Sequence, residues 1–74
     1  MFDPLRRDFS VRRGRFAIVV TFGPTDSHYR FELGPDGRIV GCSETVDREP
    51  EGFPKGSVEA MARRLAEEQT RNAR

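Results

Sequence analysis

The sequence predicts an α+β domain: a three-stranded antiparallel β-meander with one C-terminal α-helix packed on one face and a short N-terminal helical turn or arm. Apolar and β-branched residues fill residues 16–22, and an apolar/polar alternation follows at 27–33. Both patterns are typical of strands. The turn sequence GPDG occupies 34–37, and an amphipathic stretch runs over 57–72. This order of signals indicates strands first and a helix last.

Length and composition limit the architecture to one small domain. We divide the 74 residues into a basic N-terminal arm or turn (1–14), the β-meander (15–45), an acidic loop (46–56) and the helix (57–72). A domain of this size buries only about 60% of the surface of its unfolded chain. The hydrophobic fraction of 35% is correspondingly lean, and the net charge of +1 excludes a uniformly basic nucleic-acid binder.

The N-terminal segment is expected to form one helical turn over residues 4–8. Asp3 followed by Pro4 is a helix start signal, because the carboxylate can cap while proline takes the first helical position. Apolar residues at spacings of three and four then fall on one side of the turn: Phe2, Leu5 and Phe9. That apolar side needs a surface to cover.

The first two strands are expected at residues 15–22 and 27–33. Their alternation separates two sheet faces. The face that holds the helix is predicted to carry Phe16, Ile18, Val20, Phe22, Tyr29, Phe31 and Leu33. The opposite face is predicted to carry Ala17, Val19, Thr21, His28, Arg30 and Glu32.

The GPDG turn predicts the register of a third strand at residues 38–45. Pro35 presets a type I turn, and Gly37 accepts the left-handed conformation of the following bulge. This turn pairs Gly34 with Arg38, Leu33 with Ile39, Phe31 with Gly41 and Tyr29 with Ser43. It also places Val40 and Cys42 on the face opposite the helix.

The remaining chain predicts a loop followed by the helix. Acidic residues, prolines and glycines dominate residues 46–56, and Phe53 is expected to anchor this loop to the core. Ser57 is expected to cap the helix that runs to Asn72. Its apolar stripe consists of Val58, Met61, Ala62 and Leu65.

No motif for catalysis, cofactor binding or metal binding is present. In the predicted register His28 faces Glu44 with Cys42 diagonal to it, but no third group orients the histidine. One cysteine and one histidine do not make a structural metal site. We therefore predict a non-enzymatic protein without a cofactor. The single cysteine, the lack of a signal peptide and the shortness of the longest apolar run favour the cytoplasm.

The face opposite the helix is half apolar and is predicted to be covered. Either the N-terminal turn folds under it and inserts Phe2 and Leu5, or a partner binds there. We predict a small protein-binding adaptor or regulatory module whose partner is another protein or a second copy of the chain. The predicted partner-binding residues are Val19, Arg30, Glu32, Val40 and Cys42.

The alternative hypothesis is nucleic-acid binding by the N-terminal arm. Residues 1–15 hold five arginines against two aspartates, with Phe9 and Phe16 close by. Arginine beside exposed aromatic rings suits single-stranded nucleic acid. The candidate residues are Arg6, Arg7, Arg12, Arg13 and Arg15. The helical charges, by contrast, pair with opposite charges four residues apart and indicate a solvated face.

Overall fold

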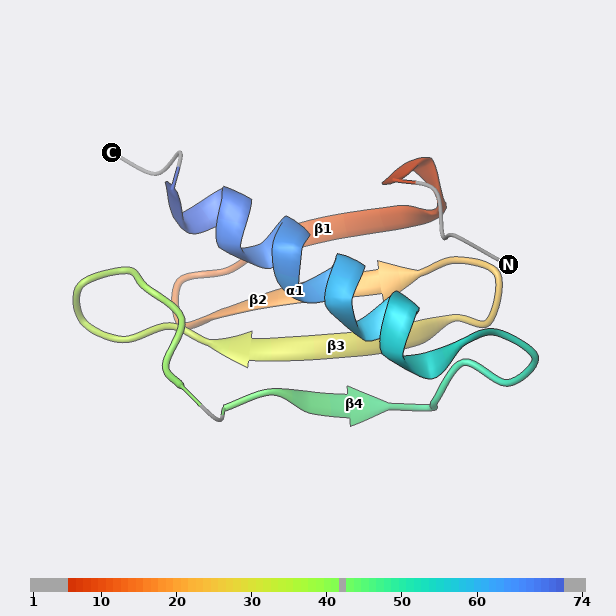
Figure 1. The fold of residues 1–74 in the computed structure, drawn as a ribbon. Coiled ribbons are helices and arrows are strands. Elements are labelled where there is room, and N and C mark those ends of the chain that lie inside the picture. The colour runs from red at the N-terminus through yellow and green to blue at the C-terminus, as the bar shows by residue number, and fades with distance from the viewer. Residues whose placement is uncertain (1–5, 42, 72–74) are drawn as a thin grey trace.

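A computed structural model describes residues 6–41 and 43–71. Figure 1 shows a meander sheet crossed by a single helix. The strands are β1 (Phe9–Arg13), β2 (Ala17–Phe22), β3 (Ser27–Glu32) and β4 (Thr45–Asp47), and the helix is α1 (Lys55–Arg71). The sheet order is β1-β2-β3-β4, and every pair is antiparallel. The predicted α+β class with a C-terminal helix is confirmed, but the sheet has four strands rather than three.

The additional strand is β1, in the segment predicted as a basic arm. Phe9 and Val11 alternate with polar residues, and they lie opposite Phe22 and Val20 of β2. This pairing brings both apolar side chains against the core on the helix side. A 3-10 turn, η1 (Arg6–Asp8), precedes the strand. The proposed insertion of Phe2 and Leu5 under the opposite face falls outside the described residues.

The core lies between β2, β3 and α1. Ile18, Val20 and Phe22 alternate toward the helix, and Tyr29 and Phe31 join them from β3. All five are at most 2% exposed, as the alternation predicts.

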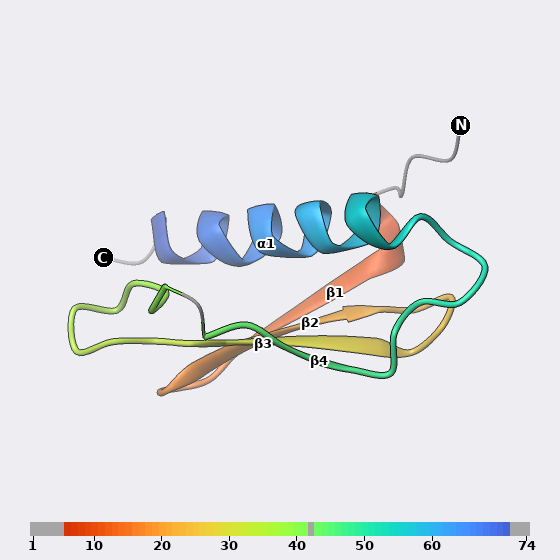
Figure 2. The same cartoon turned by 60° about the horizontal axis from the view of Figure 1, so that its bottom comes forward.

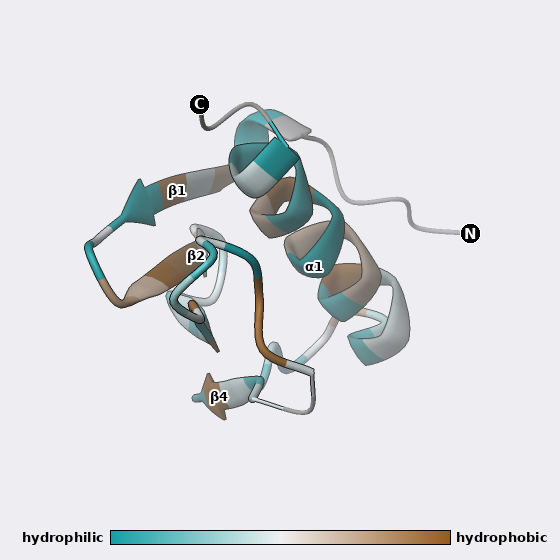
Figure 3. Ribbon diagram, turned by 90° about the vertical axis from the view of Figure 1, so that its left-hand side faces the viewer, coloured by the Kyte–Doolittle hydropathy of each residue, from teal (hydrophilic) through white to brown (hydrophobic). Residues whose placement is uncertain are grey.

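The helix covers one face of the sheet only, as Figure 2 shows from the side. Figure 3, an end-on view, shows hydrophobic segments on β1 and β2 and a mixed pattern of hydropathy along α1. The buried helix residues are Val58, Ala62, Leu65 and Ala66, with Met61 partly buried. This confirms the predicted stripe and extends it by Ala66.

The helix begins two residues earlier than predicted. It starts at Lys55, so Ser57 lies within the first turn and is not the cap. The N–H of Val58 donates to the carbonyl of Pro54 at 3.1 Å, which closes the first turn. Phe53 anchors the preceding loop as predicted, because its ring packs edge-on against Phe22 with centroids 5.1 Å apart.

The GPDG turn forms as predicted at its tip. Gly37 has a φ of 79°, and its N–H donates to the carbonyl of Gly34 at 2.9 Å. The side chain of Asp36 accepts a hydrogen bond from the N–H of Arg38 at 3.0 Å. The predicted bridge between Leu33 and Ile39 is present.

The predicted pairing also holds at Val40, whose N–H bonds to the carbonyl of Glu32, but beyond it the predicted third strand is wrong. Tyr29 pairs with Val46 instead of Ser43, and the strand is the short β4. The hydroxyl of Ser43 accepts the N–H of Glu32 at 3.1 Å and donates to the carbonyl of Val40 at 2.6 Å. A side chain thus takes the place of a backbone partner at the end of β3, so the chain bulges before β4 resumes the ladder.

Candidate interaction surface

The candidate site is the sheet face that α1 leaves uncovered, which we call the open face. The side chains on it follow from strand alternation and register. They are Ser10 and Arg12 of β1, Ala17, Val19 and Thr21 of β2, His28, Arg30 and Glu32 of β3, and Thr45 and Asp47 of β4. The face therefore combines a small apolar centre with charges of both signs.

The open face is hollowed over β1, β2 and β3. A surface hollow of about 460 Å³ is lined by Ser10, Val11, Arg12, Val19, Thr21 and His28. Val19 is half-buried, and in register it lies between Arg12 on one side and Arg30 on the other. An apolar residue flanked by two exposed guanidinium groups is a site at which both apolar and acidic groups of a partner can be bound.

The imidazole of His28 is held in place at the rim of this hollow. Its Nδ1 shares a hydrogen bond of 2.9 Å with the hydroxyl of Thr21, and its Nε2 lies 3.5 Å from a carboxylate oxygen of Asp26. The strand partner of His28 is Asp47, not the predicted Glu44. These contacts fix the ring at the edge of the open face.

The structure brings the predicted partner-binding residues together in two pairs. Val19 and Arg30 are direct cross-strand partners. Val40 is 45% exposed, and its N–H donates to the carbonyl of Glu32 at 2.9 Å, so these two lie side by side at the end of β3. Cys42 lies outside the described residues.

The predicted nucleic-acid-binding arginines within β1 project from opposite faces of the sheet. Arg12 and Arg13 alternate in β1, so Arg12 projects from the open face and Arg13 from the helix side. The Nη1 group of Arg13 donates to the carbonyl of Gln69 in α1 at 3.0 Å. Arg7 and Arg15 are exposed at the two ends of β1. Arg6 opens η1. In place of the predicted basic arm, the structure has η1 and the edge strand β1, along which these arginines are distributed.

Phe16 is the exposed residue that sequence reasoning missed. Strand alternation puts Phe16 on the same face as Ile18, Val20 and Phe22, so its burial was predicted. Its side chain is nevertheless 71% exposed. The N–H of Gly14 donates to the carbonyl of Ala17 at 2.7 Å, so Phe16 lies in the tight turn between β1 and β2. The alternation of Phe9 and Val11 with polar residues, followed by Gly14, was the sequence signal that could have revealed this turn.

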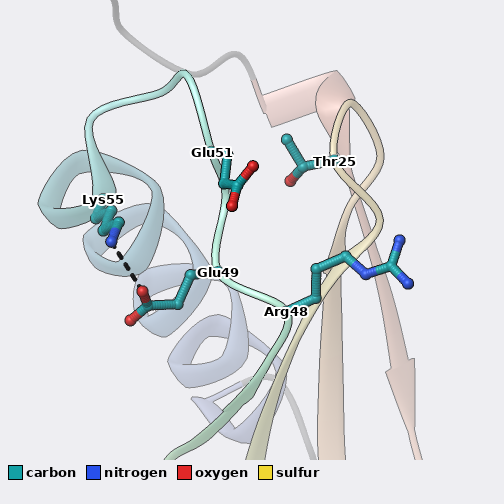
Figure 4. Close-up of a pocket in the computed structure, with 5 residues that line it drawn as sticks. All are labelled: Thr25, Arg48, Glu49, Glu51 and Lys55. Carbon is teal, nitrogen blue, oxygen red and sulfur yellow. Dashed lines mark hydrogen bonds and ion pairs between the residues drawn. The ribbon is translucent and has the colours of Figure 1, made fainter.

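A second hollow adjoins the turn between β2 and β3 and is lined by polar and charged residues. It measures about 720 Å³ and is lined by Thr25, Arg48, Glu49, Glu51 and Lys55. Figure 4 shows Lys55 directed at Glu49, with Arg48 pointing away from both glutamates. The ammonium of Lys55 lies 2.8 Å from the carboxylate of Glu49, and this hydrogen bond raises the pKa of Lys55. The two charges compensate each other, so this hollow has no marked preference for one ligand charge.

Two carboxyl groups, Glu44 just before β4 and Glu59 in α1, lie where the sheet meets the helix. The Nη2 group of Arg63 donates to Glu44 at 2.9 Å, and the side chain of Glu44 is 12% exposed. A hydrogen bond to Glu44, reinforced by the charge of Glu44, raises the pKa of Glu59 above its ordinary value. At a pH near this pKa, Glu59 is therefore protonated to a greater extent in the folded protein than in the unfolded chain.

Glu59→Gln is expected to flatten the pH dependence of stability. A carboxyl whose pKa is raised on folding stabilises the fold below its unfolded pKa of about 4.3, and this stabilisation is lost as the pH rises through the folded pKa. Glutamine keeps a hydrogen-bond donor without the charge. The variant should match or exceed the wild type near neutrality, by less than about 1 kcal/mol because the group is exposed. Urea unfolding from below about pH 4.3 to neutrality measures the free energy of unfolding of each variant, with Glu67→Gln as the control. A variant that keeps the wild-type pH profile would contradict the assignment.

Comparison with known proteins does not assign this chain to a family. No family model matches the chain, and no significant match was found among curated proteins or solved structures. Over residues 6–41 and 43–71, there is no helix with the length and apolar character needed to cross a membrane. The same residues contain no group of three or more side chains arranged to hold a metal ion.

Proposed function

We propose that this domain is a small, non-enzymatic protein-binding module that acts as an adaptor or regulator through its open face. The observation that carries the proposal is the coverage of the sheet: α1 packs on one face, and the hollow around Val19 lies on the other. A small domain with a lean core gains burial when a partner covers such a face. The single cysteine suits a reducing compartment, so the proposal places this action in the cytoplasm.

The composition of the open face supports a reversible protein contact. Val19 provides a half-buried apolar centre, and Arg12 and Arg30 flank it. Glu32 and Asp47 add negative charge further along β3 and β4. An apolar centre with a polar rim is the usual anatomy of a protein interface, and arginine is enriched in such interfaces.

Affinity capture with matched charge reversals tests the proposal. The immobilised domain is incubated with lysate from its source cells, and bound protein is identified by mass spectrometry. Arg30→Glu reverses an exposed charge on the open face, and Arg64→Glu reverses an exposed charge on α1 as the control. We expect Arg30→Glu to lose about tenfold or more of a stoichiometric protein that the control retains. Equal capture by all three proteins would contradict the proposal.

Nucleic-acid binding remains the second candidate, because Phe16 is free of the core. Phe16 is exposed and directly follows Arg15 in the turn after the arginines of β1. Stacking on a base and contact with phosphate would use these groups together. Binding of single-stranded oligonucleotides should then weaken steeply with salt and be reduced by Phe16→Ala. No binding at low salt would remove this candidate.

A further inference from the structure

We propose that the outer edge of β1 binds an extended, acidic segment of a partner protein as an additional strand. This inference rests on the proposed function, because β1 forms one border of the open face. Its first basis is the sheet order. β1 is an edge strand of five residues, and over the described part of the chain no strand lies on its outer side. In Figure 1 this edge lies along one border of the sheet, on the far side of β1 from β2.

The hydrogen-bond pattern shows which backbone groups β1 presents outward. Gly14 bonds to Ala17 and Gly23 bonds to Asp8, and both bonds belong to the β1–β2 ladder. Hydrogen-bonded positions alternate in an antiparallel pair. Ser10 and Arg12 therefore bond to β2, and three residues direct their N–H and C=O groups away from it: Phe9, Val11 and Arg13. These groups provide the donors and acceptors for a new strand.

The charges along this edge select the partner. The segment from Arg7 to Arg15 contains four arginines and one aspartate, Asp8. Two copies of the edge would place these arginines against each other, and positive charges of this kind block self-pairing of edge strands. The same charges attract a strand that carries acidic residues. Charge thus favours an acidic partner over a second copy.

Side-chain alternation defines the pattern of that partner. On the helix side, Phe9 and Val11 are half-buried and extend the core to the edge. On the open face, Ser10 and Arg12 are exposed. A strand added beside them would place apolar residues next to the first pair and acidic residues next to Arg12. The preferred segment therefore alternates apolar and acidic residues.

The probe is a blocked synthetic peptide that alternates valine and glutamate over the length of β1, and a valine–lysine peptide is the charge control. We expect the acidic peptide to protect the amides of Phe9, Val11 and Arg13 from hydrogen exchange, while the amides of β4 do not change. Binding should weaken with salt. Failure of the acidic peptide to bind, or equal binding of the lysine peptide, would overturn the proposal.

Two variants at one position separate the backbone contribution from the side chain. Val11→Pro removes an outward N–H that makes no bond to β2, whereas Val11→Ala truncates the side chain and keeps this N–H. We expect Val11→Pro to bind the acidic peptide about tenfold or more weakly than Val11→Ala. Equal affinities would overturn the proposal. If Val11→Pro does not fold, Arg13→Pro removes another outward N–H at an exposed position.

The outcomes distinguish this inference from the proposed function. If Arg30→Glu abolishes capture of the partner and the acidic peptide does not bind, the edge is rejected and the open face stands. If the peptide binds at the edge and Arg30→Glu retains the partner, the edge stands and the open face is rejected. Concentration-dependent dimerisation of the free domain that protects the same amides would overturn the acidic partner in favour of a second copy.

Discussion

Replacing Phe22 by alanine is expected to destabilise the domain by about 3–5 kcal/mol. Phe22 is fully buried and lies at the meeting point of three segments. Its ring centroid is 4.9 Å from that of Phe9 in β1 and 5.1 Å from that of Phe53 in the loop before α1. Truncation leaves a cavity that no single element can close. Because the core of a domain this small rarely supplies more than about 3–5 kcal/mol, the variant should keep little or no net stability at room temperature.

Phe16→Ala is the matched control for this substitution. It removes the same atoms from a side chain that is 71% exposed, so stability should change by no more than about 0.5 kcal/mol. Urea denaturation followed by circular dichroism measures both variants. Comparable losses in the two proteins would place Phe16 in the core, as its parity in the sequence suggests, and would contradict the turn between β1 and β2.

A charge at position 62 is expected to detach the helix from the sheet. Ala62 is fully buried on the face of α1 that meets the core. Glutamate is a good helix former, so Ala62→Glu leaves the propensity of α1 nearly unchanged. An unpaired carboxylate at this contact should cost about 3–5 kcal/mol, since neither ion pairing nor water compensates its burial.

Ala60→Glu provides the comparison, because Ala60 lies on the exposed side of the same helix. Thermal unfolding should show a large loss for Ala62→Glu and a change within about 0.5 kcal/mol for Ala60→Glu. Exposure of apolar surface can be followed by binding of a hydrophobic dye. Equal stability of the two variants would mean that α1 does not pack through this position.

The sequence predicted the elements whose periodicity is carried by many residues. β2, β3 and α1 follow directly from alternation and from the helical apolar stripe. The tip of the GPDG turn also follows, because Pro35 presets the backbone of the turn and Gly37 tolerates the left-handed conformation that ends it. In these segments the information that determines the structure lies within the segment itself.

The strands at the two edges of the sheet were not predicted, for different reasons. β1 has only two apolar residues, Phe9 and Val11, and their spacing relative to Phe2 and Leu5 also fits a helical turn. Pairing with β2 decides between the two, and that contact is not local. β4 is three residues long and exposed throughout, so it has no hydrophobic pattern to detect.

The part of the site that depends on which sheet face a strand residue occupies could be predicted from the sequence. Val19 and Arg30 were assigned to the face away from the helix, and the structure makes them cross-strand partners. The hollow is lined partly by Ser10 and Arg12 of β1. It could not be predicted, because this segment was expected to be an arm or turn and not a strand. The exposure of Phe16 has the same origin, because its turn exists only if β1 pairs with β2.

The meander topology has a consequence for the order in which the chain folds. Each strand pairs with the strand beside it in sequence, so each hairpin closes a short loop. The helix is different: the hydrogen bond from Arg13 to Gln69 joins positions 56 residues apart. Docking of α1 therefore closes the longest loop, and we expect it to be the slowest step of folding. During synthesis we expect the hairpins to form before residues 55–71 emerge. Ile18, Val20 and Phe22 would then stay uncovered, and aggregation or a chaperone could compete with folding in this interval.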